Sequence, residues 1–180
     1  MVYAPVREKM LGKYEYKYAV MMQCRFDGTL GFPGGIVDSG ETPEASVTRE
    51  FVEEVGVAVG DVVFEEKDHI VTHVSDHTHF CLHFFAREVD LDMFVAMERK
   101  ALLSKDWGQE VMGIVRCPLY TLPNGLGLPA FLKHDFIGNS RDQLLIGIER
   151  RGLLSPAELK EAVRMSAHAN SLVTVDDTNI

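Results

Sequence analysis

The chain has 180 residues, of which 46% are hydrophobic and 25% charged, a balance typical of a globular protein with a sizeable core. Its net charge of −9 argues against broad nucleic-acid binding, which needs many Lys and Arg contacts to phosphates, but allows the grip of one nucleotide or RNA end. No apolar run approaches the roughly 20 residues of a membrane helix, and no signal peptide begins the chain. We therefore expect an intracellular protein. Its three scattered cysteines predict reduced thiols.

A β-hairpin is expected first. Residues 18–25 predict a strand, and Asp27-Gly28 is a strong hairpin turn. Residues 30–32 begin the return strand, which Pro33-Gly34-Gly35 interrupts and residues 36–37 resume. The two strands should therefore lie side by side.

A helix follows the hairpin. Thr42 before Pro43 is a helix start with proline at the first helical position. The helix is expected to run to about Val55 and to end at Gly56, a residue type that favours helix C-termini.

The rest of the chain mixes predicted strands and helices, which indicates an α/β fold. We expect one domain over residues 1–167 and a disordered C-terminal tail over 168–180. The predicted elements are extended segments at 62–66, 71–74 and 78–86, a helix from Asp90 to about Leu103, a strand at 111–116, a Pro/Gly-rich loop at 118–129, and two helices that begin with capping boxes, Ser140 with Gln143 and Ser155 with Glu158.

Three acids in the first helix stand out. Glu50, Glu53 and Glu54 share one face at helical spacing, while residues such as Phe51 and Val55 bury the opposite side. Like charges so close repel one another. Divalent Mg²⁺ or Mn²⁺ between them would remove that repulsion, and a close-lying backbone carbonyl such as that of Gly34 could add a ligand. An ordinary helix with a solvated acidic face is the simpler interpretation of this short stretch taken alone.

The wider segment, GIVDSGETPEASVTREFVEEVGV from Gly35 to Val57, resembles the Nudix box and makes the metal interpretation the stronger one. Nine positions match at the motif's spacing: Gly35, Glu41, Arg49, Glu50, Phe51, Glu53, Glu54, Gly56 and Val57. The resemblance implies an α/β/α Nudix sandwich with a mixed sheet, in which this segment is the catalytic loop-helix-loop. It also implies that Glu50, Glu53 and Glu54 bind the metals and that Arg49 orients a glutamate.

Segments 18–35, 116–131 and 136–145 resemble a group of animal Nudix enzymes that remove caps from small nucleolar RNA and hydrolyse inosine diphosphate. The resemblance implies substrate contacts for Arg25, Phe32, Gln143 and His73, a homodimer, and a place in the nucleus, nucleolus and cytoplasm. Glu110 falls where many Nudix enzymes carry a late metal ligand or base. A solvated loop acid explains Glu110 equally well, and surface, core and helix-capping roles would explain Arg25, Phe32 and Gln143. No residue here matches an N-terminal histidine that stacks on the base in that group, so we expect weaker base stacking.

A histidine-rich stretch, which contains His69, His73, His77, His79 and His83, suggests a zinc site at first sight. Neighbouring residues on one face of a strand lie nearly 7 Å apart, which is too far for ready-made ligands. We therefore do not predict structural zinc here.

The sequence thus predicts a metal-dependent hydrolase that cleaves phosphoanhydride bonds in nucleoside diphosphate derivatives. Favoured substrates are (deoxy)inosine and guanosine diphosphates and the 5′ caps of RNA. The alternative is a non-catalytic RNA- or protein-binding module on a Nudix scaffold. A scaffold has no need of the metal-binding acids, and all three are present here.

Overall fold

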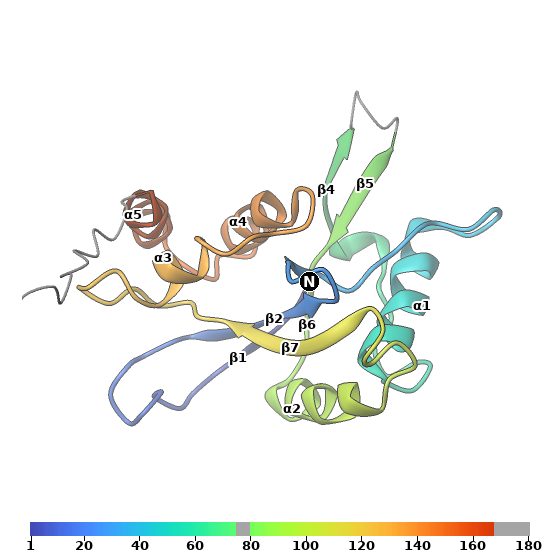
Figure 1. Ribbon diagram of the computed structural model, residues 1–180, viewed down its shortest axis with the longest axis horizontal. Coiled ribbons are helices and arrows are strands. Elements are labelled where there is room, and N and C mark those ends of the chain that lie inside the picture. The colour runs from blue at the N-terminus through green and yellow to red at the C-terminus, as the bar shows by residue number, and fades with distance from the viewer. Residues whose placement is uncertain (75–79, 168–180) are drawn as a thin grey trace, which may run out of the picture.

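A mixed five-stranded sheet forms the centre of the computed structural model, which describes residues 1–74 and 80–167 (Figure 1). Strand β1 pairs antiparallel with β2 and parallel with β6, and β2 pairs antiparallel with both β3 and β7. The strands are β1 (Val2–Pro5), β2 (Tyr18–Arg25), β3 (Leu30–Gly31), β6 (Arg87–Glu88) and β7 (Val111–Cys117).

Strand β2 lies in the middle of this sheet. One edge pairs with β7 from Val20 to Arg25. The first half of its other edge pairs with β1, and the second half pairs with β3 at Gln23 and Cys24. Residues near Gln23 are therefore enclosed by strands on both sides.

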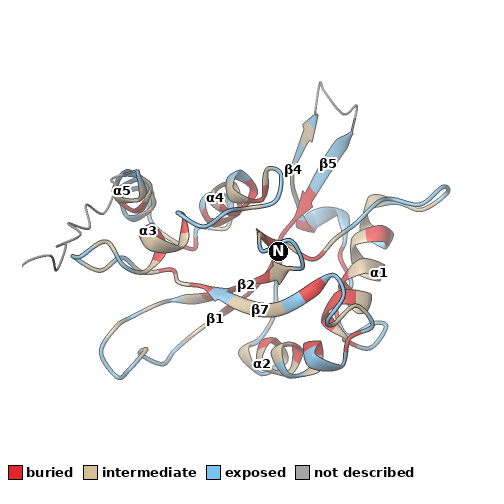
Figure 2. Ribbon diagram, viewed as in Figure 1, coloured by how far each residue is buried: buried red, intermediate tan, exposed pale blue. Residues whose placement is uncertain are grey.

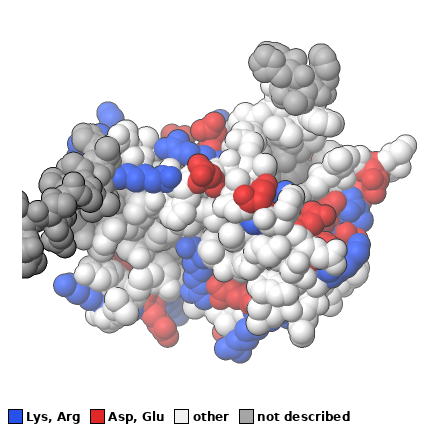
Figure 3. All heavy atoms as spheres, viewed as in Figure 1, with Lys and Arg blue, Asp and Glu red and all other residues white. Residues whose placement is uncertain are grey.

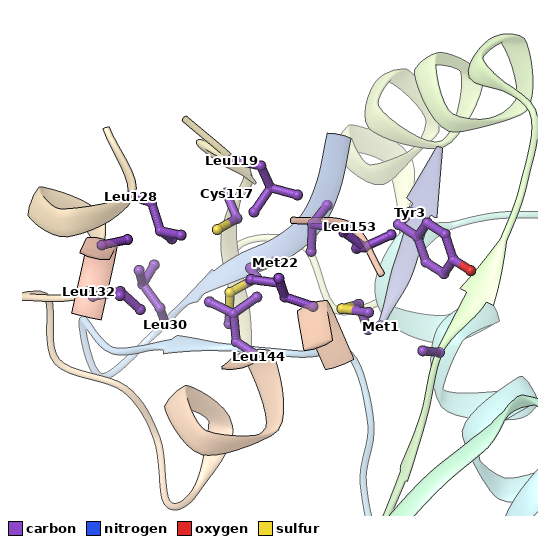
Figure 4. Packing of buried hydrophobic residues seen from close by; sticks show 14 of the residues in the cluster. Met1, Tyr3, Met22, Leu30, Cys117, Leu119, Leu128, Leu132, Leu144 and Leu153 are labelled. Atoms are coloured by element: carbon purple, nitrogen blue, oxygen red, sulfur yellow. The ribbon is translucent and has the colours of Figure 1, made fainter. Parts of the chain in front are cut away.

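Alternate side chains of β2 enter two different cores. Ala19 and Met21 pack with the apolar face of α1 (Pro43–Val55) and α2 (Leu91–Lys100). Val20 and Met22 pack on the other side with α3 (Leu128–Phe131), α4 (Ser140–Arg150) and α5 (Pro156–Ser166), as Figure 4 shows for Met22 and Leu144. Helices thus cover both faces of the sheet, and the predicted α/β class is confirmed.

Strands β4 (His69–Val74) and β5 (Cys81–Phe85) form a second, two-stranded sheet. It projects from the body of the molecule (Figure 1). Its base is buried through Phe84 and Phe85, while its outer part is largely exposed (Figure 2). Two short 3-10 helices, η1 (Glu66–Asp68) and η2 (Ala101–Leu103), complete the described elements.

Several predicted elements have the predicted bounds. Strand β2, the turn at Gly28, and helix α1 with its Thr42 and Gly56 caps are confirmed. So is the Ser155–Glu158 capping box of α5. These features depend on residues that lie close together in the sequence.

Other predictions were wrong. Ile36 and Val37 do not resume a strand: both side chains are exposed, and neither residue forms a β-ladder with another strand in the described chain. Residues 62–65 precede η1 without forming a strand. The predicted loop at 118–129 ends early, because α3 begins at Leu128.

The start of α4 also differs from the prediction. Ser140 is the first residue of the helix, Asn139 is its N-cap, and no side chain caps it. The capping box proposed for Ser140 with Gln143 is therefore wrong.

The predicted tail lies outside the described residues. Within residues 1–74 and 80–167, no helix combines the length and apolar character needed to cross a membrane.

Candidate active site

Helix α1 is fixed at both ends by the residues that predicted it. Oγ1 of Thr42 accepts a hydrogen bond from the Ala45 backbone at 3.2 Å. At the other end Gly56 adopts φ 72° and donates to the Val52 carbonyl at 3.0 Å, which closes the last turn. The helix therefore holds its acidic residues at set positions beside the turn at 33–35.

Glu54 is the most enclosed of the three acids, with 2% of its surface exposed. Its Oε2 accepts hydrogen bonds from the backbone N–H of Gly34 at 3.0 Å and from Nε2 of Gln23 at 3.2 Å. Burial is the main cause that raises the pKa of Glu54 to about 7; the hydrogen bonds from Gly34 and Gln23 oppose the rise, and the negative charges of Glu50 and Glu110 add to it. Glu54 thus faces inward, whereas the sequence placed it on a face opposite the buried side.

Arg49 connects the helix to the loop before it. Its guanidinium donates to Glu50 Oε1 at 2.7 Å, to both carboxylate oxygens of Glu41 at 3.2 and 3.1 Å, and to the Ile36 carbonyl at 3.2 Å. Hydrogen bonds to Glu41 and then Glu50 raise the pKa of Arg49 above its ordinary value. In this arrangement Arg49 fixes the direction of the Glu50 carboxylate.

Glu53 lies between two cations of the chain. Its Oε2 is 3.3 Å from Nζ of Lys105 and 3.9 Å from Arg49. Figure 3 shows acidic and basic side chains side by side where α1 faces the viewer. Positive side chains thus already balance part of the acidic charge of α1.

The donor set suits Mg²⁺ or Mn²⁺, which favour carboxylate and carbonyl oxygens. Gly35 forms a cradle beside Glu50, because a Cβ there would collide with the Glu50 carboxylate. The side-chain oxygen of Gln23, Oε1, is buried beside Glu54 and lacks a hydrogen-bond partner in the described chain. Within residues 1–74 and 80–167, no group of three His, Cys, Asp or Glu side chains is arranged to hold a metal ion in this structure. The residues therefore fit a divalent cation in chemistry, with Glu50 and Glu53 held by Arg49 and Lys105.

Glu110 precedes β7 and is exposed. Its backbone carbonyl accepts from the Phe26 N–H at 3.1 Å, which fixes the loop against the β2–β3 hairpin. Its negative charge is one of the causes that raise the pKa of Glu54, after burial and the charge of Glu50. Glu110 thus lies near enough to Glu54 for the two charges to interact.

Arg25 and Phe32 lie at the β2–β3 hairpin. Nε of Arg25 is buried without a hydrogen-bond partner in the described residues, 3.7 Å from the Asp27 carboxylate, and the guanidinium stacks on Phe26 at 5.6 Å. Phe32 packs against Phe84, with ring centroids 5.1 Å apart. Phe32 precedes Gly34 by two residues, so the same turn links it to Glu54.

His73 and Gln143 meet the same end of α4. Nδ1 of His73 lies 3.0 Å from Nδ2 of Asn139. Gln143 follows one turn later, is 8% exposed, and its backbone N–H donates to the Asn139 carbonyl at 3.0 Å. The structure therefore places two of the predicted substrate residues next to Asn139.

The other histidines form a surface network on the hairpin. Thr72 Oγ1 lies 2.9 Å from His69 Nε2 and 2.9 Å from His83 Nδ1. His77 and His79 lie outside the described residues.

Comparison with known proteins gives the family. Residues 1–154 match the model of the Nudt16-like family, described as U8 snoRNA-decapping enzyme-like. The chain belongs to this family of Nudix hydrolases. The Nudix enzyme class predicted from the sequence is thereby confirmed.

The individual proteins that this chain is similar to carry two kinds of name. The U8 snoRNA-decapping enzyme of Bos taurus is 44% identical over 158 residues, which cover 87% of this chain and 81% of the relative. That of Mus musculus is 42% identical over the same shares. The Tudor-interacting repair regulator protein of Gallus gallus is 39% identical over 166 residues, or 91% of this chain and 52% of the relative.

The sequence did not point to Gln23, Lys105 or Asn139. Gln23 left a signal, because it is an amide inside the otherwise apolar stretch from Tyr18 to Cys24. Lys105 and Asn139 left none, because each contacts an element far from it in the sequence.

Proposed function

We propose that this chain is a divalent-metal hydrolase of phosphoanhydride bonds in nucleoside diphosphate derivatives. The arrangement around Glu54 carries the proposal. An ionisable side chain is held in the protein interior by two donors, next to Glu50, and close enough to Glu110 to sense its charge. A buried carboxyl group with further acids beside it is costly for a protein unless it serves to bind a cation.

Glu50, Glu53 and Glu54 would hold Mg²⁺ or Mn²⁺, with the Gly34 carbonyl as a further ligand. A bound cation would neutralise phosphate oxygens and lower the pKa of water. Arg49 maintains the direction of the Glu50 carboxylate through the 2.7 Å bond, and its contacts with Glu41 anchor the preceding loop. Glu110 would serve as an additional metal ligand or base. The α1 segment would then be the catalytic loop-helix-loop of a Nudix α/β/α sandwich.

We propose (deoxy)inosine and guanosine diphosphates and 5′ caps of RNA as substrates. The similarity to proteins named U8 snoRNA-decapping enzyme supports this choice. Arg25 offers a guanidinium fork to phosphate or a base edge, Gln143 an amide, and His73 a ring nitrogen. Phe32 would support the base or ribose from the hairpin side.

The test is a substrate panel of nucleoside diphosphates, dinucleotides and capped RNA with Mg²⁺ and with Mn²⁺. Glu53→Gln and Glu54→Gln should each lower kcat by at least about 100-fold, in the range seen when groups that act on the reacting charge are removed. Glu44→Gln, on the same helix, is the control and should keep normal turnover. Near-normal hydrolysis by both site variants at saturating metal would contradict the assignment.

A second candidate is a protein-binding module. The similarity to the Tudor-interacting repair regulator of Gallus gallus favours it. A protein-binding module should turn over no substrate in the panel, and its partner binding should not depend on Glu53 or Glu54. The complete set of motif acids in this chain makes the hydrolase the better-supported proposal.

The homodimer and the nuclear, nucleolar and cytoplasmic location implied by the resemblance remain predictions. Sedimentation of the purified protein tests the first, and imaging of the tagged full chain tests the second.

A further inference from the structure

Gln23 is an amide side chain with no exposed surface, in the centre of the sheet. Its backbone pairs with Gly31 of β3 on one side and Ile114 of β7 on the other. Met21, two residues earlier on the same face, belongs to the apolar core under α1. A buried amide destabilises a fold unless it is hydrogen-bonded, so a residue of this type in this place calls for a specific contact.

That contact is with Glu54. Nε2 of Gln23 and the backbone N–H of Gly34 both donate to the same carboxylate oxygen, Oε2. Among the described residues no donor bonds to Oε1 of Glu54. The opposite orientation of the amide would set its carbonyl oxygen against an ionised carboxylate, which is unfavourable.

The structure assigns Gln23 as a positioning residue for Glu54: with Gly34 it occupies Oε2 and leaves Oε1 as the oxygen that a divalent cation can use. This inference rests on the proposed function in that Glu54 is taken as a cation ligand. Partners that orient metal ligands influence affinity strongly, because a ligand that must first find its direction binds more weakly. Gln23 acts through Glu54 and touches neither substrate nor reacting atoms in this assignment.

The test replaces the amide without opening a large cavity. Gln23→Met keeps the length and removes the donor. Met21→Leu changes the same face of the same strand at nearly constant volume and is the matched control. Free Mn²⁺ measured by electron paramagnetic resonance gives the affinity of each variant. We expect Gln23→Met to bind Mn²⁺ roughly 10- to 100-fold more weakly, and Met21→Leu to stay within about twofold of the unmodified chain.

A double-mutant cycle separates positioning from a general loss of structure. In a Glu54→Gln background, Gln23→Met should cause no further loss of Mn²⁺ affinity, because the carboxylate that it orients is gone. An equal loss in both backgrounds would overturn the assignment, as would unchanged affinity in Gln23→Met alone. Circular dichroism selects the variants that fold, and Gln23→Leu replaces Gln23→Met if the latter does not.

Activity measurements on the same proteins keep this inference distinct from the proposed function. If the unmodified chain hydrolyses no substrate but Gln23→Met weakens Mn²⁺ binding through Glu54, the positioning role stands and the hydrolase proposal fails. If the unmodified chain is active with Mg²⁺ and Gln23→Met matches it in Mn²⁺ affinity and in kcat, the hydrolase proposal stands and the positioning role fails.

Discussion

Nδ2 of Asn139 lies 3.0 Å from Nδ1 of His73, and this contact joins the start of α4 to strand β4. Asparagine is a favoured N-cap because its side chain can accept from the first turn of a helix. Asn139 occupies the N-cap position of α4 yet makes no capping bond. Its amide is used instead on an imidazole 66 positions away in the sequence, where it fixes the ring.

Asn139→Ala should therefore affect substrate binding more than stability. We expect its KM for a nucleoside diphosphate to rise as much as that of His73→Ala, with no further rise in the double variant. Its free energy of unfolding should fall by less than about 0.5 kcal/mol, whereas Ser155→Ala, which removes a real cap of α5, should lose about 1 kcal/mol. Urea denaturation and steady-state kinetics give both values. A loss of stability equal to that of Ser155→Ala, with unchanged KM, would contradict the orienting role.

The metal-free protein should become less stable as the pH rises from the ordinary pKa of Glu54 to its raised pKa in the folded state. Burial raises the pKa of Glu54 from an ordinary 4.5 to about 7 in the folded state. Between these values the folded chain keeps a proton that the unfolded chain releases, so the free energy of unfolding falls with increasing pH. The total is on the order of 3 kcal/mol. Urea denaturation in chelator from pH 4 to 8 measures it. Glu54→Gln should lack this component, and identical pH profiles for the two proteins would show that Glu54 is not the source.

Gln143 should make the enzyme prefer hypoxanthine and guanine to adenine. Both favoured bases present O6 and N7 acceptors to an amide donor, whereas adenine has a donor at position 6. We expect kcat/KM for inosine and guanosine diphosphates to exceed that for adenosine diphosphate by roughly tenfold, equivalent to about 1.4 kcal/mol. Gln143→Ala should remove the preference, and Asp142→Ala, an exposed change on the same helix, should keep it. A preference that survives Gln143→Ala would move base reading to another residue, Arg25 first.

Gly56 should be intolerant of a side chain for two reasons. Its φ of 72° is unfavourable for other residues, and a Cβ there would lie 2.8 Å from the Lys100 carbonyl oxygen at the end of α2. Gly56→Ala should therefore lower the free energy of unfolding by about 2 kcal/mol or more. Gly60→Ala, with φ 94° and no atom within 4 Å of the new Cβ, carries the backbone penalty alone and should lose less. If urea denaturation gave equal losses of unfolding free energy for the two variants, the ends of α1 and α2 would be able to move apart at no cost, contrary to this prediction.

Elements with strong local signals were predictable from the sequence. The Asp27-Gly28 turn, the Thr42 cap and the Gly56 stop each act within a few residues, and β2 and α1 have the bounds that these signals set. Strands β1 and β6 escaped prediction because they are short and pair across long separations, as Val2 does with Arg87. The choice of Asn139 over Ser140 as N-cap was likewise beyond local reasoning, because either residue type suits the position.

The candidate site divides in the same way. Glu50, Glu53 and Glu54 could be singled out because one helix carries them and their spacing follows a known motif. The inward direction of Glu54 could not, because it depends on Gln23, 31 positions earlier. The contact of Lys105 with Glu53 also depends on how the segment after α2 returns to α1. The sequence indicated which groups could do chemistry, and the tertiary structure determined which neighbours direct them.

The central place of β2 has a consequence for how the protein is made on the ribosome. Strands β1, β2 and β3 are synthesised early. The partner of β1 at Arg87, in β6, and the partner of one whole edge of β2, β7 at residues 111–117, are synthesised later. At about 5–20 residues per second, apolar strands with open hydrogen-bonding edges are exposed for several seconds. Pairings this distant in sequence also close slowly. The nascent chain is therefore most prone to aggregation, and most in need of chaperone cover, before β7 has been synthesised.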